Sequence, residues 1–284
     1  MTSLLDPAFV RELERLKVEL RRRLDGPHAG ERRGLRRGAG VEYAGHRPYA
    51  PGDDLRRVDW NAFARLRELV FRTTLPDTDA TVHLVLDASR SMAFGEPSKL
   101  RVACRLAAAI GYLCLTGSER VGLHVEAGEG SAPRPPWRGR ARVPSLLAAL
   151  EALRPAGAAS LARAAGALKG ARGGLAVCFT DGLDEGAEAA VGRLAATGLE
   201  CCLVQVLSDE ELSPAFDGDL ELVDSESGET LRLSVDEGVA SELHARVRAL
   251  SEALEGQCRR RGVRYVGAFG GAEALSVLAR VLGA

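Results

Sequence analysis

The chain has 284 residues and a formal net charge of −1, and 46% of its residues are hydrophobic against 27% charged. This balance is typical of a globular protein that can bury a full core, and it excludes disordered and fibrous classes of protein. Residues 1–7 lack the features of a signal peptide, and the most apolar helical stretch, residues 102–115, contains Arg105 and is too short to cross a bilayer. We therefore expect a cytoplasmic protein without a membrane span.

An amphipathic helix is predicted at the amino terminus. Its apolar residues recur at three- and four-residue spacing: Phe9, Leu13, Leu16 and Leu20. Residues 1–72 carry sixteen Lys and Arg against eleven Asp and Glu, a net charge of +5, whereas the rest of the chain carries −6. Because this basic part has few aromatic residues for base stacking, we expect it to dock on the acidic remainder or on a protein, and we expect no nucleic-acid partner.

A second segment, residues 30–78, is rich in turn formers and paired charges. Its central part contains a Pro-Gly turn followed by two adjacent acids and two nearby arginines: Asp53, Asp54, Arg56 and Arg57. These four side chains could pair with one another, which needs no ligand, or they could form a surface for a protein partner. We name them as the candidate partner surface.

Apolar runs alternate with helical patterns over residues 79–284. We expect strands near residues 81–86, 120–126, 133–138, 174–180, 199–207 and 263–268. We expect helices near residues 98–116, 143–153, 159–169, 186–197, 238–261 and 271–282. This alternation predicts an α/β fold with a doubly wound, mostly parallel, Rossmann-like sheet, flanked by helices, in the strand order 3-2-1-4-5-6.

Two of the predicted strands end in acids. The first is followed by Asp87, Ser89 and Ser91, and the fourth by Asp181. In the predicted order these two strands are neighbours at the switch point, where such folds bind ligands, so we expect Asp87 and Asp181 in one crevice. Carboxylates and hydroxyls are the hard oxygen donors that Mg²⁺ prefers. The alternative, in which Asp87 forms an Asx turn and Ser91 caps the next helix, needs no metal.

These motifs resemble the metal-ion-dependent adhesion site of von Willebrand factor type A domains. The resemblance lies in the sequence DASRS, which begins at Asp87, and in the sequence TDG around Asp181. It implies a von Willebrand factor A-like sheet in which Ser89 and Ser91 bind Mg²⁺ or Mn²⁺ directly. The two acids would bind the same metal ion directly or through water.

In that family a threonine from a later loop normally completes the metal site. The corresponding loop here, residues 155–161, contains no threonine. Ser160 could supply the missing hydroxyl, although the better alignment places Ala159 at that position.

Residues 42–65 and 221–233 are similar to a signature and an inserted β-hairpin of the bacterial domain-of-unknown-function 58 family. The resemblance covers residues 30–283 and implies a MoxR-type AAA+ ATPase as the partner. It also implies a domain organisation. An amino-terminal helix (residues 1–29) precedes a signature segment packed on the main domain (residues 30–78). The main, von Willebrand factor A-like domain (residues 79–284) contains the inserted hairpin near residues 219–235.

The chain carries none of the catalytic motifs that we sought. It lacks G-x-x-x-x-G-K-[ST] and G-x-S-x-G, and a haloacid-dehalogenase-like phosphatase would have an acid where Ser89 stands. A metal held largely by hydroxyls stays electrophilic and can bind a carboxylate of a partner, so we expect a non-enzymatic, metal-dependent protein-interaction module. One alternative is a Mg²⁺-dependent hydrolase or phosphotransferase that uses Asp87 and Asp181. Another is a scaffold whose metal site has degenerated, as Ala159 would indicate.

Overall fold

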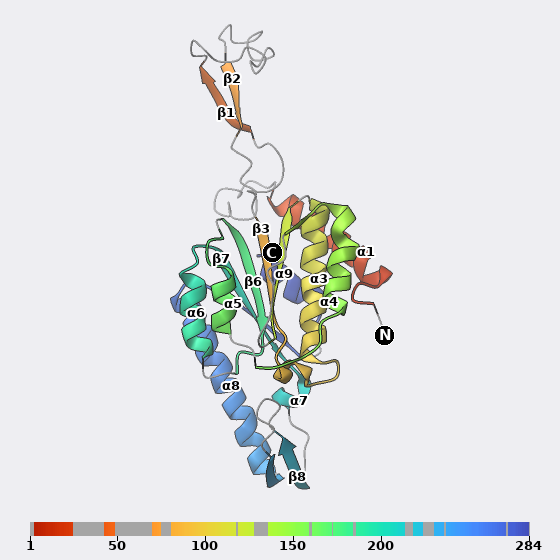
Figure 1. Ribbon diagram of the computed structural model, residues 1–284, viewed down its shortest axis with the longest axis vertical. Helices are drawn as coiled ribbons and strands as arrows, with labels where there is room; N and C mark the ends of the chain where they lie inside the picture. The colour runs from red at the N-terminus through yellow and green to blue at the C-terminus, as the bar shows by residue number, and fades with distance from the viewer. Residues whose placement is uncertain are drawn as a thin grey trace.

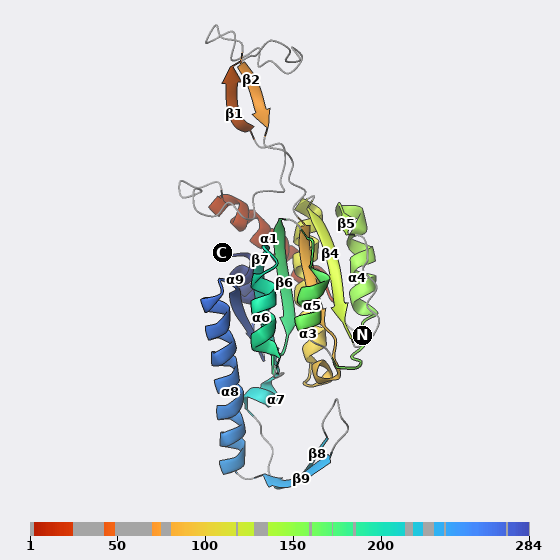
Figure 2. The same ribbon diagram turned by 60° about the vertical axis from the view of Figure 1, so that its left-hand side comes forward.

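A six-stranded sheet with helices on both sides forms the centre of the protein (Figures 1 and 2). The computed structural model describes residues 3–24, 43–48, 70–74, 81–117, 119–127, 136–158, 161–171, 173–183, 186–213, 218–223, 230–235, 237–270 and 272–283. Every structural statement below refers to these parts of the chain.

The central sheet has the strand order β10-β7-β6-β3-β4-β5. Its strands are β3 (Thr81–Asp87), β4 (Arg120–Glu126), β5 (Trp137–Arg138), β6 (Gly174–Thr180), β7 (Glu200–Leu207) and β10 (Arg264–Phe269). Numbered in chain order within the sheet, this arrangement is the predicted 3-2-1-4-5-6. Neighbouring strands pair in parallel everywhere except at β5, which is antiparallel to β4.

The third strand differs from the prediction near residues 133–138. It contains only Trp137–Arg138 and reverses direction. A parallel connection needs a crossover of about a dozen residues or more, usually helical. The ten residues between β4 and β5 are too few for such a crossover, so β5 pairs antiparallel with β4 and the sheet is mixed.

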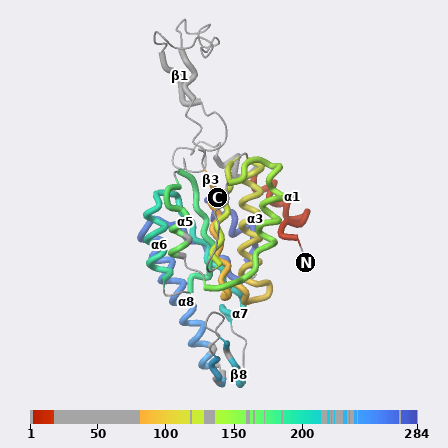
Figure 3. The backbone as a smooth tube through the Cα atoms, viewed as in Figure 1, coloured from red at the N-terminus to blue at the C-terminus, as the bar shows by residue number. Residues whose placement is uncertain are grey.

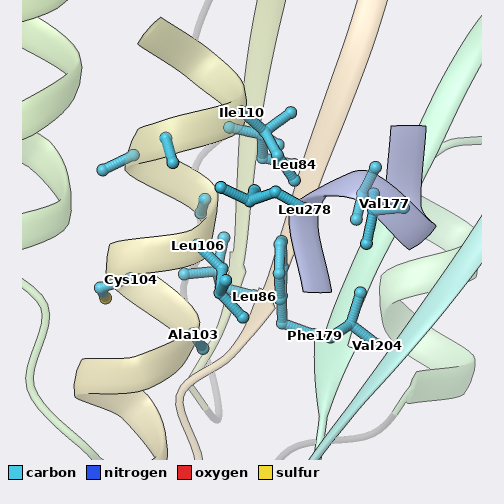
Figure 4. Packing of buried hydrophobic residues seen from close by; sticks show 14 of the residues in the cluster. Leu84, Leu86, Ala103, Cys104, Leu106, Ile110, Val177, Phe179, Val204 and Leu278 are labelled. Carbon is cyan, nitrogen blue, oxygen red and sulfur yellow. The ribbon is translucent and has the colours of Figure 1, made fainter. Parts of the chain in front are cut away.

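Helices cover both faces of the sheet (Figures 1 and 2). On one side lie α1 (Pro7–Leu24), α3 (Lys99–Gly117), α4 (Val143–Glu151) and α9 (Ala274–Leu282). On the other side lie α5 (Leu161–Ala167), α6 (Ala187–Ala195) and α8 (Glu237–Arg260). Two apolar clusters result because side chains alternate between the two faces of a strand. Figure 4 shows part of the larger cluster, in which Leu84, Leu86 and Phe179 of the sheet meet Leu106 and Ile110 of α3.

The helix α3 is the most buried helix of the fold. Among the described helices it alone is long and apolar enough to cross a membrane by length and composition, because it extends beyond residues 102–115, the stretch judged too short from the sequence. Of its most apolar stretch, however, 72% is buried inside the protein. At Gly111 a Cβ atom would collide with Leu146 of α4, so glycine allows these two helices to pack closely. The burial is that of a core helix.

The predicted amino-terminal helix is present as α1. The side chain of Asp6 accepts a 2.9 Å hydrogen bond from the backbone N–H of Phe9 and caps the helix. Phe9 and Leu13 are buried in the larger apolar cluster. Arg105 of α3 forms an ion pair with Asp6 and places its guanidinium 4.5 Å from the centre of the Phe9 ring. The helix is therefore held on the domain by apolar packing, charge and a cation–π contact.

Two antiparallel hairpins lie outside the central sheet. The predicted hairpin near residues 219–235 is formed by β8 (Gly218–Val223) and β9 (Thr230–Val235). It leads into α8, whose amino-terminal half extends past the carboxyl edge of the sheet (Figure 3). A second pair, β1 (Tyr43–Pro48) and β2 (Val70–Thr74), was not predicted. Short 3-10 turns, η3 (Arg90–Ala93) and η4 (Arg140–Arg142), and the single-turn helix α7 (Asp209–Leu212) complete the described elements.

A pair of histidines joins β3 to β4 within the sheet. His83 Nδ1 lies 3.1 Å from His124 Nε2. Burial and the neighbouring His124 lower the pKa of His83 to about 4. A Cβ at Gly122 would lie 3.2 Å from His83 Nδ1, so this glycine leaves room for the two rings. The pair satisfies its own hydrogen bond and needs no ligand.

This pair predicts acid sensitivity. The unfolded chain protonates His83 near its ordinary pKa of 6.5, whereas the folded chain resists protonation down to about 4. The stability that neutral His83 contributes is therefore present above pH 6.5 and is lost as the pH falls from 6.5 towards 4. We expect the melting temperature of H83Q to fall less than that of the wild type over this window. Equal slopes in calorimetric scans from pH 7 to pH 4 would contradict this assignment.

Candidate functional site

Two neighbouring strands, β3 and β6, end side by side at the carboxyl edge of the sheet. Their register pairs Leu86 with Phe179, so the following residues are adjacent. The Thr180 hydroxyl donates a hydrogen bond of 2.8 Å to Asp87 Oδ2. The structure thus brings the end of β6, with Asp181, next to Asp87, as the strand order predicts.

The loop after β3 gathers three oxygen-bearing side chains. Asp87 Oδ1 accepts a 2.9 Å hydrogen bond from the backbone N–H of Ser89. This is the Asx turn that we gave as an alternative interpretation of the motif. The hydroxyls of Ser89 and Ser91 lie 2.9 Å apart. Ser91 does not cap the next helix, because no side chain caps η3 and Ser98 accepts the hydrogen bond from the first turn of α3. We call Asp87, Ser89, Ser91 and Asp181 the strand-end site.

The Asp87 carboxylate is in an unfavourable environment for its charge. Burial, first, and the negative charge of Asp181, second, raise its pKa above the ordinary value. Hydrogen bonds from Ser89 and Thr180 offset part of this effect. A positive charge placed next to Asp87 would therefore be stabilised by the site.

The loop before α5 packs directly on the strand-end site. The backbone N–H of Ala156 donates to the carbonyl of Ala88 at 2.8 Å, and the N–H of Arg90 donates to the carbonyl of Gly157 at 3.0 Å. These bonds place residues 155–158 beside the loop that carries the serines. Ser160 and Ala159, the alternative further ligands, lie outside the described residues and stay predictions.

A buried lysine that was not predicted from the sequence contacts the site. Lys99, the first residue of α3, has a side chain that is only 2% exposed. Its ammonium donates to Asp181 Oδ2 at 2.8 Å and to Glu211 Oε1 of α7 at 2.6 Å. Burial lowers the pKa of Lys99, but the two carboxylates outweigh burial and raise it above the ordinary value, so the lysine stays charged. The signal in the sequence is weak: Lys99 opens a mostly apolar helix that also carries Arg101 and Arg105.

Further hydrogen bonds hold the Glu211 carboxylate and the backbone of Asp181, the two residues that Lys99 contacts. The side chain of Glu211 accepts from the backbone N–H of Ser208 at 2.9 Å, while Ser208 Oγ accepts from the N–H of Glu211 at 3.3 Å. This capping box orients Glu211 towards the lysine. Gln205, which is fully buried, donates its amide to the backbone carbonyl of Asp181 at 2.7 Å. Tyr265 donates in turn to the side-chain oxygen of Gln205.

The charges and the donor atoms of the site fit a divalent cation. Asp87, Asp181 and Glu211 carry three negative charges against the single positive charge of Lys99, a formal net charge of −2. The oxygens of neighbouring ligands on an octahedral Mg²⁺ ion, at about 2.1 Å from the metal, are about 3.0 Å apart. The two serine hydroxyls form a hydrogen bond of 2.9 Å with each other, and this separation also suits two neighbouring ligands of the ion. Within the described residues no three His, Cys, Asp or Glu side chains could hold a metal, so a cation here would depend on the serines.

The candidate partner surface lies elsewhere in the chain. Asp53, Asp54, Arg56 and Arg57 all fall outside the described residues, so their predicted role stays a prediction.

Comparisons with known proteins identify a family for the chain and similar proteins from other bacteria. The family described as "Protein of unknown function DUF58" matches residues 45–253. Uncharacterized proteins from Mycobacterium bovis and Mycobacterium tuberculosis are each 32% identical over 238 residues, which cover 81% of this chain and 75% of theirs.

Two solved structures from Bacteroides also match the chain. An aerotolerance-related membrane protein from Bacteroides fragilis is 19% identical with a TM-score of 0.43, over 71% of this chain and 96% of that chain. The conserved hypothetical protein BatB from Bacteroides thetaiotaomicron is 18% identical with a TM-score of 0.44, over 72% of this chain and 97% of that chain.

Proposed function

The chain belongs to the family described as protein of unknown function DUF58, and from this premise we propose that it is a non-enzymatic, metal-dependent protein-interaction module. We propose a von Willebrand factor A-like fold for its main domain and a cytoplasmic location. Mg²⁺ or Mn²⁺ is the proposed ion, bound at the strand-end site. The partner implied by the resemblance of the sequence to this family is a MoxR-type AAA+ ATPase.

The observation that carries the proposal is the pair of serine hydroxyls beside Asp87. Their 2.9 Å spacing, the adjacent carboxylate and the net charge of −2 support binding of a hard divalent cation. Asp87, Ser89 and Ser91 would hold the ion, and Ser160 is a further ligand that we propose from the neighbouring loop. The ion would supply an electrophilic centre for a carboxylate of the partner.

Exposed apolar side chains near the same end of the protein support a protein partner. Phe94, three residues after Ser91, is 45% exposed. Leu243 and Leu250 are each 44% exposed on one face of α8, which extends past the carboxyl edge of the sheet in Figure 3. Leu231 of the β8–β9 hairpin is 63% exposed. Apolar groups near a charged site suit a protein surface better than a small polar substrate.

Binding between the purified chain and a MoxR-type ATPase from the same organism tests the proposal. We expect the complex to form with Mg²⁺ or Mn²⁺, to dissociate with chelator, and to be lost in D87A and S89A. Loss of the metal contact removes a charge-assisted bond at the interface, so the affinity should fall by about a hundredfold or more. The matched control is S276A, which removes an exposed hydroxyl from α9 and should bind like the wild type.

Two outcomes would overturn this proposal. If R56A and R57A abolish binding while chelator and the strand-end variants have no effect, the partner docks on the candidate partner surface. If a screen with phosphate esters and nucleic acids finds Mg²⁺-dependent hydrolysis that D87N abolishes, the chain is an enzyme. In that case Asp87 and Asp181 belong to a hydrolase or phosphotransferase.

A further inference from the structure

The buried ammonium of Lys99 forms an ion pair with Asp181 of the strand-end site. It lies 2.8 Å from Asp181 Oδ2, and both side chains are almost fully buried, with exposed fractions of 2% and 8%. The backbone carbonyl of Asp181 is held separately by Gln205. Asp181 is thus fixed from two sides and already has a positive partner.

Moving Asp181 onto a metal would break this arrangement. A buried ammonium without its carboxylate is strongly destabilising, since the charge then has no solvent and fewer partners. Glu211 would remain, but it is also bound to the backbone of Ser208. Asp87 differs, because the groups that contact it within the described residues, the Ser89 N–H and the Thr180 hydroxyl, are hydrogen-bond donors without charge.

We propose that Lys99 sets the charge and the ligand choice of the strand-end site by holding Asp181 away from direct contact with the bound cation. This inference rests on the proposed metal site. Asp87 is then the single protein carboxylate bound to the ion, and Asp181 acts on the ion only through space or through water. The ion keeps part of its positive charge, and that charge selects a carboxylate as the ligand supplied by the partner.

Charge arithmetic separates this role from a purely structural one. With Lys99 the cluster of three carboxylates has a net charge of −2, and without Lys99 it has −3. K99M should therefore bind Mn²⁺ more tightly, by about tenfold or more, because a positive charge near the ion is gone and Asp181 is released. A lysine that only supports the fold would leave the affinity unchanged or weaken it.

The decisive variant is the charge-matched double substitution K99M/D181N. It removes one positive and one negative charge, so the net charge of the cluster stays at −2 and no unpaired lysine remains. If Asp181 does not touch the ion, the double variant should bind Mn²⁺ within about threefold of the wild type in calorimetric titration. If Asp181 is a direct ligand, its affinity should fall by about a hundredfold, as we expect for D87N.

Each result has one meaning. Tight binding by K99M/D181N together with loss of binding in D87N supports the inference. An equal loss of Mn²⁺ affinity in the double variant and in D87N overturns the inference but still supports the proposed metal site. Unchanged binding in D87N overturns both, because the ion then lies elsewhere. If K99M alone does not fold, D181N gives the same distinction, with an expected loss below about tenfold.

Discussion

Mg²⁺ or Mn²⁺ should raise the free energy of unfolding of the wild type by about 2.7 kcal/mol when the free ion is at a hundred times its Kd. Only the folded chain brings Asp87 next to the two serine hydroxyls, so the ion binds the folded state and not the unfolded state. D87N should lose the whole gain. Thermal or urea unfolding across a metal titration measures both quantities.

The same variant should behave in the opposite way without metal. Burial and the charge of Asp181 raise the pKa of Asp87, so at neutral pH its ionised carboxylate is less stable in the folded chain than in the unfolded chain. Replacing it by a neutral amide removes that penalty, and metal-free D87N should be at least as stable as the metal-free wild type. The two stability curves should therefore cross as metal is added. A wild-type melting temperature that stays constant up to millimolar metal would instead favour a degenerate site.

The strand order of the sheet could be predicted because it depends on patterns that are local in sequence. Apolar runs mark the strands, helical periodicity marks the crossovers, and the handedness of those crossovers leaves few topologies. The strand-end residues Asp87, Ser89, Ser91 and Asp181 were visible for the same reason. Each lies within a few residues of the end of an apolar run.

Other elements depend on geometry that the sequence does not display. Lys99 meets Asp181 and Glu211 across sequence separations of 82 and 112 residues, and α7 is a single turn without an apolar pattern. The strand β1 contains glycine and proline, which are disfavoured inside strands, so its pairing with β2 was not predicted. The strand β5 is antiparallel to β4 because the segment that connects them is too short for a crossover.

The lysine changes what the family resemblance alone would suggest about the site. From motifs, both acids are equivalent candidates for the metal, and only the missing threonine distinguishes this chain from the pattern. The structure separates the acids: Asp181 has an ammonium partner and Asp87 has hydroxyl and amide donors. Asp181 is thus linked through Lys99 to α3 and to Glu211 of α7, whereas Asp87 lies beside the loop that carries Ser89 and Ser91.

Replacing Lys99 by methionine should destabilise the protein by about 3–5 kcal/mol in the absence of metal. Methionine matches the apolar stem of lysine, so the packing of α3 is largely kept. The loss comes from Asp181 and Glu211, whose side chains are only 8% and 15% exposed and would be left without their shared ammonium. Urea unfolding followed by circular dichroism measures the effect.

Matched substitutions assign this loss to the buried charges. K169M removes an exposed lysine and should change the free energy of unfolding by less than about 0.5 kcal/mol. K99M/D181N should recover a large part of the stability, since one of the two orphaned carboxylates becomes a neutral amide that can still accept hydrogen bonds. A loss below about 1 kcal/mol in K99M would mean that the ammonium does not stabilise this pair. With Lys99 in place, Asp181 and Glu211 keep a charged partner whether or not an ion is bound, so the fold can release its metal without exposing two unpaired buried acids.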